Sequence, residues 1–180
     1  MQPKLIVVSR TVFVSYGVTV AVLAIYLMLT CPQQQRAAIV ALALFGWLVW
    51  SAIEYGMHRF VLHGLQPVRA WHAAHHRRPR TLVIGSALLS TMLIAILIVV
   101  PALLMENPWH ALALSLGLQS GYLGYAITHH AIHHWHLDNA WLKERQRWHE
   151  QHHHSEHPGC FGVTSSFWDW VFGSTRLSRA

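Results

Sequence analysis

Histidine is the residue type whose number and spacing most directly suggest chemistry in this sequence. The chain has 16 histidines among 180 residues, against 7 aspartates and glutamates in total. Most of the histidines fall into four short clusters, and two of these clusters repeat spacings of three and four residues. Residues at those spacings lie on one face of a helix. Because neutral imidazole is a ligand suited to iron, zinc and copper, the pattern predicts metal binding.

Ten histidines, drawn from all four clusters, are the expected metal ligands. Since one ion takes roughly four to six ligands, ten suit two metals rather than one. The first cluster is unusual, because five residues separate its two histidines. That is about 500° of rotation on a regular helix, so the two rings would bind different metals unless the helix ends near Gly64. The ten are His58, His63, His72, His75, His76, His129, His133, His149, His152 and His153.

Carboxylates and thiols are scarce around these clusters. A ferritin-like di-iron site uses Glu-x-x-His pairs, whereas histidines would replace the carboxylates here. Glu54 precedes His58 by four residues, and it either orients that imidazole or is a solvated charge at a helix end. Cys31 and Cys160 form no C-x-x-C pair, which excludes thiolate zinc fingers, redox motifs and a disulfide framework. We expect no catalytic side chains beyond the metal ligands.

The composition indicates that the chain carrying these histidines is an integral membrane protein. Hydrophobic residues make up 53% of the chain and charged residues 11%, whereas soluble domains carry about 25% charged residues. Crossing a bilayer takes about 20 apolar helical residues. We expect one all-α domain over residues 1–180, built as a bundle of four transmembrane helices with a cytosolic histidine-rich helical cap. The spans lie at about 12–30, 37–57, 82–104 and 109–128, and the cap comprises 58–80 and 129–180.

The distribution of basic residues predicts the topology. Of the thirteen lysines and arginines, only Arg36 falls on the side of the two short inter-helical turns. The positive-inside rule then places both termini, the middle segment and 15 of the 16 histidines in the cytosol. We expect a multi-pass protein of the bacterial inner membrane, or of the endoplasmic reticulum if the source is eukaryotic. The lysines and arginines that give the net charge of +6 lie beside apolar spans, so we expect no nucleic-acid partner.

A membrane metal-binding or transport protein is the alternative from another functional class. Transporters place polar ligands near the middle of broken helices. In this chain the expected spans carry no ionisable residue at mid-depth, and the histidine clusters sit at their ends. The pattern therefore favours an enzyme.

The clusters and the tail resemble those of the fatty acid hydroxylase/sterol desaturase superfamily. The resemblance rests on His58-Arg59-Phe60-x-x-His63 and on the order of the three later clusters. The tail Phe161-Gly-Val-Thr-Ser-Ser-Phe-Trp-Asp-Trp-Val-Phe-Gly-Ser174 is similar to the segment that closes the catalytic domain in that family. The similar region runs from about Ala37 to Thr175.

The resemblance implies a membrane-bound oxygenase with two iron ions held by the ten histidines, and zinc in their place is plausible in a purified sample. It also implies O₂, electrons from an outside donor and hydroxylation of a lipid acyl chain. Since no cytochrome b5 domain is present, the donor would be a separate protein. The short gap from His63 to His72 is similar to that of carotenoid ring hydroxylases, and lipid or sterol desaturases share the clusters. Both remain alternatives.

Overall fold

The computed structural model describes residues 10–80, 87–154 and 159–175, and every regular element within them is a helix. The all-α prediction is therefore confirmed for these residues. The first five residues of the predicted span 82–104 lie outside them, as do parts of the predicted cap at 155–158 and 176–180. The chain divides into two compact units, Met1–Trp50 with Val83–Leu123, and Ser51–Leu82 with Gly124–Ala180. We describe each unit by itself.

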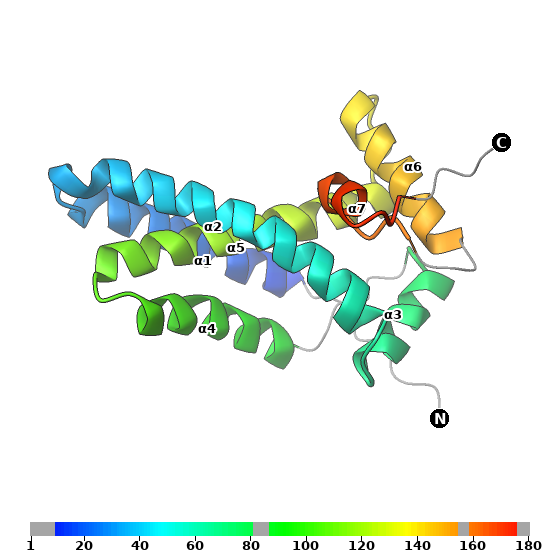
Figure 1. Cartoon of the computed structure of the whole chain (residues 1–180), viewed down its shortest axis with the longest axis horizontal. Helices are drawn as coiled ribbons and strands as arrows, with labels where there is room; N and C mark the ends of the chain where they lie inside the picture. Colours follow the sequence, from blue (N-terminus) through cyan, green and yellow to red (C-terminus); the bar gives the residue numbers. More distant parts are fainter. Residues whose placement is uncertain (1–9, 81–86, 155–158, 176–180) are drawn as a thin grey trace. The chain divides into compact units, whose positions relative to one another are not determined.

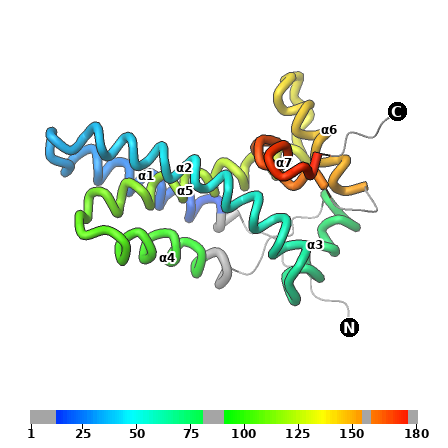
Figure 2. The backbone as a smooth tube through the Cα atoms, viewed as in Figure 1, coloured from blue at the N-terminus to red at the C-terminus, as the bar shows by residue number. Residues whose placement is uncertain are grey.

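The first unit is built from long apolar helices, α1 (Arg10–Thr30), α2 (Arg36–Gly56), α4 (Ala87–Leu104) and α5 (Pro108–His134). The last turns of α2 and α5 belong to the second unit. Figure 1 shows the four helices running alongside one another. The two short connections, one through the 3₁₀ turn η1 (Gln33–Gln35) and one between α4 and α5, lie at the same end of this unit (Figure 2).

Glycines and aromatic rings allow α2 and α5 to pack closely in this unit. A Cβ atom on Gly117 would lie 2.0 Å from the carbonyl oxygen of Ala43, so only glycine fits there. Nearby, the ring of Tyr122 lies 4.3 Å from that of Tyr16 on α1 and contacts Trp50 edge-on at 5.3 Å. Small residues at such contacts are typical of helices that associate within a membrane.

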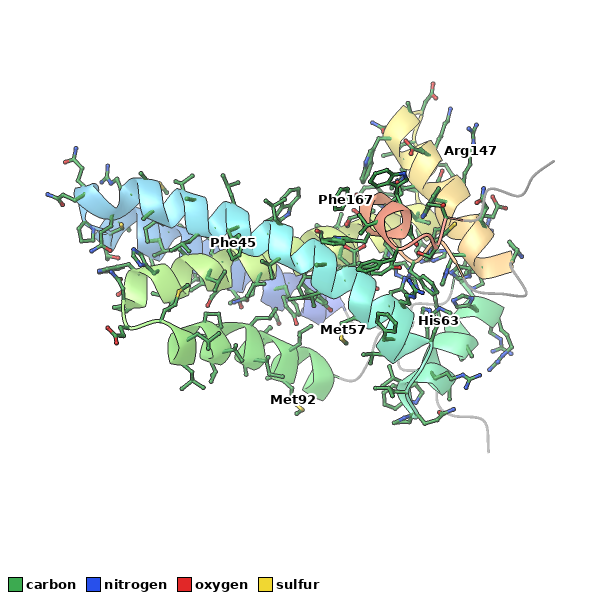
Figure 3. All side chains as sticks on the ribbon, in the orientation of Figure 1. Phe45, Met57, His63, Met92, Arg147 and Phe167 are labelled. Atoms are coloured by element: carbon green, nitrogen blue, oxygen red, sulfur yellow. The ribbon has the colours of Figure 1, made fainter. Side chains whose placement is uncertain are left out.

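Two helical stretches of the described chain are long and apolar enough to cross a membrane, Phe13–Thr30 and Gln33–Leu62. In the 18-residue window that qualifies each stretch, only 17% and 22% of the residues are buried inside the protein. Apolar side chains such as Phe45 and Met92 project outward from this unit (Figure 3). An exposed apolar surface on long helices is typical of lipid contact rather than of a soluble core. Thr91–Leu104 is a shorter apolar stretch, and the predicted span 109–128 falls within α5.

The second unit holds the shorter helices and the polar loops. They are the π-helical turn η2 (Met57–Leu62), α3 (Val68–Arg77), α6 (Ala140–His154) and α7 (Phe167–Val171). A small core of Ala131 and Ile132 on α5, Leu142 on α6 and Val163 in the tail ties these segments together. Trp168 of α7 donates a hydrogen bond from Nε1 to Ser51 Oγ at 3.1 Å, which fixes α7 against α2.

Candidate metal centre

All ten predicted ligands lie in the second unit and converge from four elements. His58 belongs to η2, and His63 follows it directly. The remaining eight sit in regular helical stretches, where spacings of three and four residues point side chains the same way. α3 supplies His72, His75 and His76, α5 supplies His129 and His133, and α6 supplies His149, His152 and His153.

Five of these rings form one compact group, which we call group one. One ring nitrogen from each lies within 4.8 Å of all the others. Neighbouring Nε2 atoms are closer still, at 3.1 Å between His58 and His72 and 3.0 Å between His63 and His152. The members of group one are His58, His63, His72, His76 and His152.

The other five rings form group two with the same convergence, again within 4.8 Å. The Nε2 atoms of His149 and His133 are 3.1 Å apart, and those of His153 and His149 are 3.0 Å apart. The members of group two are His75, His129, His133, His149 and His153.

Helices α3 and α6 each contribute to both groups in opposite proportion. α3 gives His72 and His76 to group one and His75 to group two, while α6 gives only His152 to group one and its other two to group two. The rings of His76 and His153 stack at 4.2 Å, so the two groups touch. Each helix thus spans both groups, as a dinuclear site requires.

The π-helical turn η2 explains how His58 and His63 reach the same group. On a regular helix their rings would face different directions, which led us to expect two metals or a helix end near Gly64. The wider turn of Met57–Leu62 brings the ring centroids to 5.4 Å. Both histidines consequently point into group one, and the helical stretch ends at Leu62 with His63 as its C-cap, which confirms the expected helix end near Gly64. Such π-helical turns occur often at functional sites.

Hydrogen bonding alone does not account for this convergence, whereas a metal ion does. A carbonyl oxygen only accepts, so His58 donates Nδ1–H to Phe161 O at 2.5 Å and its Nε2 carries a lone pair. His72 Nε2 faces the Nε2 atoms of His58, His63 and His76 at 3.0–3.1 Å and has at most one proton to share among them. Nitrogens bound at roughly 2.1 Å to one ion at right angles lie about 3.0 Å apart. The residues therefore fit a metal ion in each group.

Burial keeps these imidazoles neutral, which is the form that binds metal. Desolvation, reinforced by neighbouring histidines, lowers the pKa of His63 to about 4 and that of His75 to about 3. The same causes lower the pKa of His133 to about 4 and that of His153 to about 2. At neutral pH the site presents lone pairs rather than positive charges.

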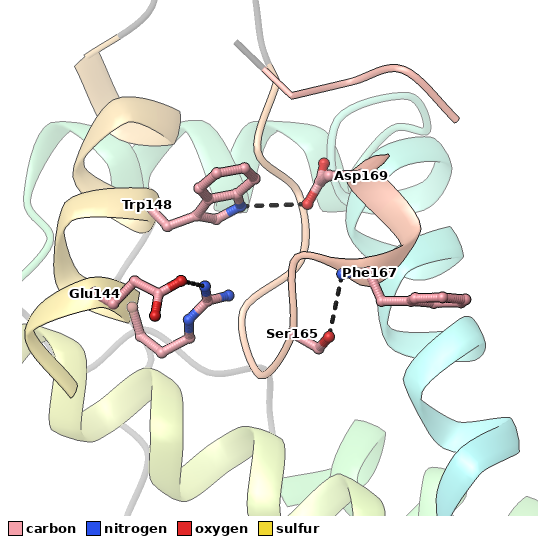
Figure 4. A network of polar contacts seen from close by, with 6 residues as sticks. Glu144, Trp148, Ser165, Phe167 and Asp169 are labelled. Carbon is pink, nitrogen blue, oxygen red and sulfur yellow. Dashed lines mark hydrogen bonds and ion pairs between the residues drawn. The ribbon is translucent and has the colours of Figure 1, made fainter. Parts of the chain in front are cut away.

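A tail loop, Gly159–Thr164, passes beside group one and orients two of its rings. Its carbonyl oxygens accept hydrogen bonds from His58 Nδ1 at Phe161 and from His152 Nδ1 at Gly159, the latter at 2.7 Å. Asp169 holds this loop from within the tail, since its Oδ1 accepts from Phe161 N at 2.8 Å and its Oδ2 from Gly162 N at 2.7 Å. Figure 4 shows Asp169 also receiving a hydrogen bond from Trp148 Nε1.

Glu54 has a role that neither sequence interpretation described. It is buried, with 4% exposure, so it is not a solvated helix-end charge, and its hydrogen bonds go to the tail loop rather than to His58. Val163 N donates to its Oε1 at 2.9 Å, and Thr164 Oγ1 donates to its Oε2 at 2.6 Å. Asp169 was not singled out from the sequence. Its position between two tryptophans of the recognised tail is the one signal that could have singled it out.

The remaining described histidines stay outside both groups. His130 and His134 lie on α5 beside two ligand positions, and their rings stack on each other at 4.5 Å. His136 and His154 are exposed. The structure thus brings the ten predicted ligands together and leaves these four, and His110 near the start of α5, outside both groups.

Comparisons with known proteins point to one family. The profile described as fatty acid hydroxylase matches residues 43–174. A ceramide very long chain fatty acid hydroxylase of Schizosaccharomyces pombe is 32% identical over 155 residues, which cover 73% of this chain and 41% of the relative. A dihydroceramide fatty acyl 2-hydroxylase of Arabidopsis thaliana is 32% identical over 158 residues, covering 81% and 63%. The chain therefore spans less than two thirds of these relatives' lengths.

A solved structure shares the fold. It is described as full-length scs7p with only the hydroxylase domain visible, and it aligns with a TM-score of 0.77 at 25% identity. The alignment covers 94% of this chain and 67% of that chain. The similarity extends over both units of the present fold.

Proposed function

Because the chain belongs to the fatty acid hydroxylase family, we propose that it is a membrane-bound di-iron oxygenase that hydroxylates the acyl chain of a lipid. The observation that carries this proposal is the convergence of ten imidazoles into two adjacent groups of five. The overall reaction would consume O₂, two electrons and two protons for each C–H bond converted to C–OH, and release water. The electrons would come from a separate donor protein.

The ten histidines would hold two iron ions, one in each group. Imidazole also suits zinc, so a purified sample could carry zinc in the same places. When bound and reduced, the iron pair supplies O₂ activation and oxidation of an aliphatic C–H bond. Convergence and burial support this role, since His58, His149 and His152 are each at most 2% exposed.

The protein's own contribution is to orient ligands and to exclude water. The carbonyls of Gly159 and Phe161 fix the proton on Nδ1 of His152 and His58, which leaves Nε2 free to bind metal. Low pKa values keep the remaining rings neutral, so metal binding need not displace protons at pH 7. Burial also keeps bulk water from the reacting centre. We propose no catalytic side chain besides the ligands.

We propose four membrane spans at about 12–30, 37–57, 82–104 and 109–128, with both termini in the cytosol. Two apolar helices and the location of both short turns at one end of the first unit support this topology (Figure 2). The concentration of lysine and arginine in the termini, middle segment and tail supports the orientation. We interpret residues 1–180 as one catalytic domain, because α2 and α5 each run from one unit into the other.

The test is a lipid analysis of cells with and without the gene, read by mass spectrometry. Acyl chains heavier by one oxygen atom in expressing cells would support hydroxylation, and fragmentation would locate the new hydroxyl group. The names of two relatives specify ceramide or dihydroceramide acyl chains, so sphingolipids and free fatty acids are the first classes to compare. Loss of two hydrogens would indicate desaturation instead, and a change confined to carotenoids would indicate a ring hydroxylase.

The same cells distinguish lipid hydroxylation from metal transport, when both their lipids and their metal content are measured. A transporter would change cellular metal content without changing any lipid. An oxygenase would change lipids and leave the metal content of the cytosol near that of control cells. Unchanged lipids of all three classes, in cells that supply iron and an electron donor, would refute the proposed function.

A further inference from the structure

The two histidine groups differ in what orients their rings. In group one, His58 and His152 each donate Nδ1–H to a backbone carbonyl of the tail loop, at 2.5 and 2.7 Å. These bonds select the tautomer whose Nε2 lone pair faces the other rings. They also fix the ring planes before any metal binds.

In group two, three of the five histidines lack such support among the described residues. The Nδ1 atoms of His75, His149 and His153 are buried and have no hydrogen-bond partner there. His75 and His149 are only 4% and 1% exposed, so bulk solvent does not reach these rings. Packing orients these rings, but no acceptor selects their tautomer.

The tail loop, whose carbonyls orient the rings of group one, is itself held by two carboxylates. Asp169 accepts hydrogen bonds from Phe161 N and Gly162 N, and Glu54 accepts them from Val163 N and Thr164 N, the last two both at 2.9 Å. Four consecutive amides of the loop are therefore held by two buried carboxylates. Space is tight around the loop, because a Cβ atom on Gly162 would lie 1.9 Å from Ser165 O.

We propose that the two metal ions are held unequally, with the tighter ion in group one, and that Asp169 and Glu54 are positioning residues for that ion. They act through the tail loop and touch no metal ligand themselves. The inference rests on the proposed two-metal function. Its physical basis is that outer hydrogen-bond partners fix ligand tautomers and raise ligand basicity, and their loss costs roughly 10- to 100-fold in metal affinity.

The first test measures metal release from the full chain loaded with two equivalents of Zn²⁺ in detergent. Excess chelator is added, and the zinc that remains bound is counted over time. We expect two phases of about one ion each, with rates that differ about tenfold or more. His149→Ala should remove the fast phase and His58→Ala the slow phase. Equal rates, or the reverse assignment, would overturn the inference.

The second test replaces the two carboxylates that hold the tail loop. Asp169→Ala and Glu54→Ala should speed the slow phase about 10- to 100-fold and leave the fast phase unchanged. Asp169→Asn, which keeps one acceptor oxygen, should restore part of the slow rate. Glu144→Gln is the matched control, because that carboxylate is 66% exposed and pairs with Arg145 (Figure 4). Acceleration of both phases alike would indicate general loosening and refute a positioning role.

These measurements separate the inference from the proposed function. A wild-type chain that binds fewer than two ions would contradict the two-metal site itself. A chain that binds two ions with one common release rate would leave the proposed function standing and refute only the unequal binding. Because the wild-type protein alone gives this result, the test does not depend on the variants folding.

Discussion

Glu54 and Thr164, which are 110 residues apart, are joined by two hydrogen bonds. The amide of Thr164 donates to Oε1 at 2.9 Å, and its hydroxyl donates to Oε2 at 2.6 Å. One carboxylate at the end of a long apolar helix thereby fixes the loop that carries the orienting carbonyls. The geometry of group one thus depends on a contact between distant parts of the sequence.

Thr164→Val should destabilise the protein, because it keeps the shape of the side chain and removes the hydroxyl donor. A hydrogen bond to a charged group contributes about 1.5–3 kcal/mol, and we expect a loss of that size in the free energy of unfolding. Denaturant unfolding in detergent would measure it. Ser165→Ala is the control, since that partly exposed hydroxyl accepts a hydrogen bond from Phe167 N (Figure 4), and it should cost less than about 1 kcal/mol. Equal losses in the two variants would contradict the special role of Glu54.

His76→Ala and His153→Ala should each reduce bound metal and abolish hydroxylated product. The two rings stack where the groups meet, so each variant removes a ligand from one group and disturbs the other. Elemental analysis of the purified protein and lipid analysis of expressing cells would measure both effects. His154→Ala, which replaces an exposed histidine next to His153, should change neither quantity. Full activity in both ligand variants would refute the site.

The metal-free protein should lose stability as the pH falls from 7 toward 4. The unfolded chain binds protons at the ordinary histidine pKa of 6.5, whereas folding lowers the pKa of His63 to about 4 and that of His75 to about 3. Between these values the unfolded state holds more protons, so acid favours unfolding. Denaturant unfolding of the chelated protein at pH 7.0 and 5.5 should differ by at least about 1 kcal/mol. Equal stability at the two pH values would contradict the burial of neutral rings.

Gly117→Ala and Gly124→Ala, both on α5, should have opposite effects. A Cβ atom at Gly117 meets the backbone of Ala43 at 2.0 Å and that of Trp47 at 2.9 Å, so the helices must separate. Overpacking of this kind costs about 1–3 kcal/mol. At Gly124 no atom lies within 4 Å, and alanine should stabilise the helix by up to about 1 kcal/mol. Thermal unfolding would compare them, and a stabilising Gly117→Ala would contradict the close helix contact.

Local features of this site could be predicted from sequence because its helices α3 and α6 are regular. Spacings of three and four residues translate directly into neighbouring side chains, so the convergence of His72, His75 and His76 was predictable, whereas their division between two groups was not. The role of Glu54 could not be predicted in the same way, because its partners lie 109 and 110 residues away. Asp169 was missed for a related reason, since the flanking tryptophans mark its position but do not show that its carboxylate binds the amides of Phe161 and Gly162.

The prediction of membrane spans was likewise confirmed for some helices and left open for others. Two of the four predicted spans correspond to helices long and apolar enough to cross a bilayer. The third is cut short because its first residues lie outside those described, and the fourth contains glycines and polar residues that lower its apolar character. Tight helix contacts such as Gly117 with Ala43 explain why such residues stand in α5.

The π-helical turn at Met57–Leu62 has a consequence for how such sites are found in genomes. A wide turn converts a separation of five residues into the spatial neighbourhood that four residues give elsewhere. A search that accepts only the periods of ordinary helices would discard the His58–His63 pair. Deleting one residue between them would restore the ordinary period and leave both rings on one side. Sequence surveys for clustered histidine ligands should therefore allow a spacing of five residues where a helix widens in this way.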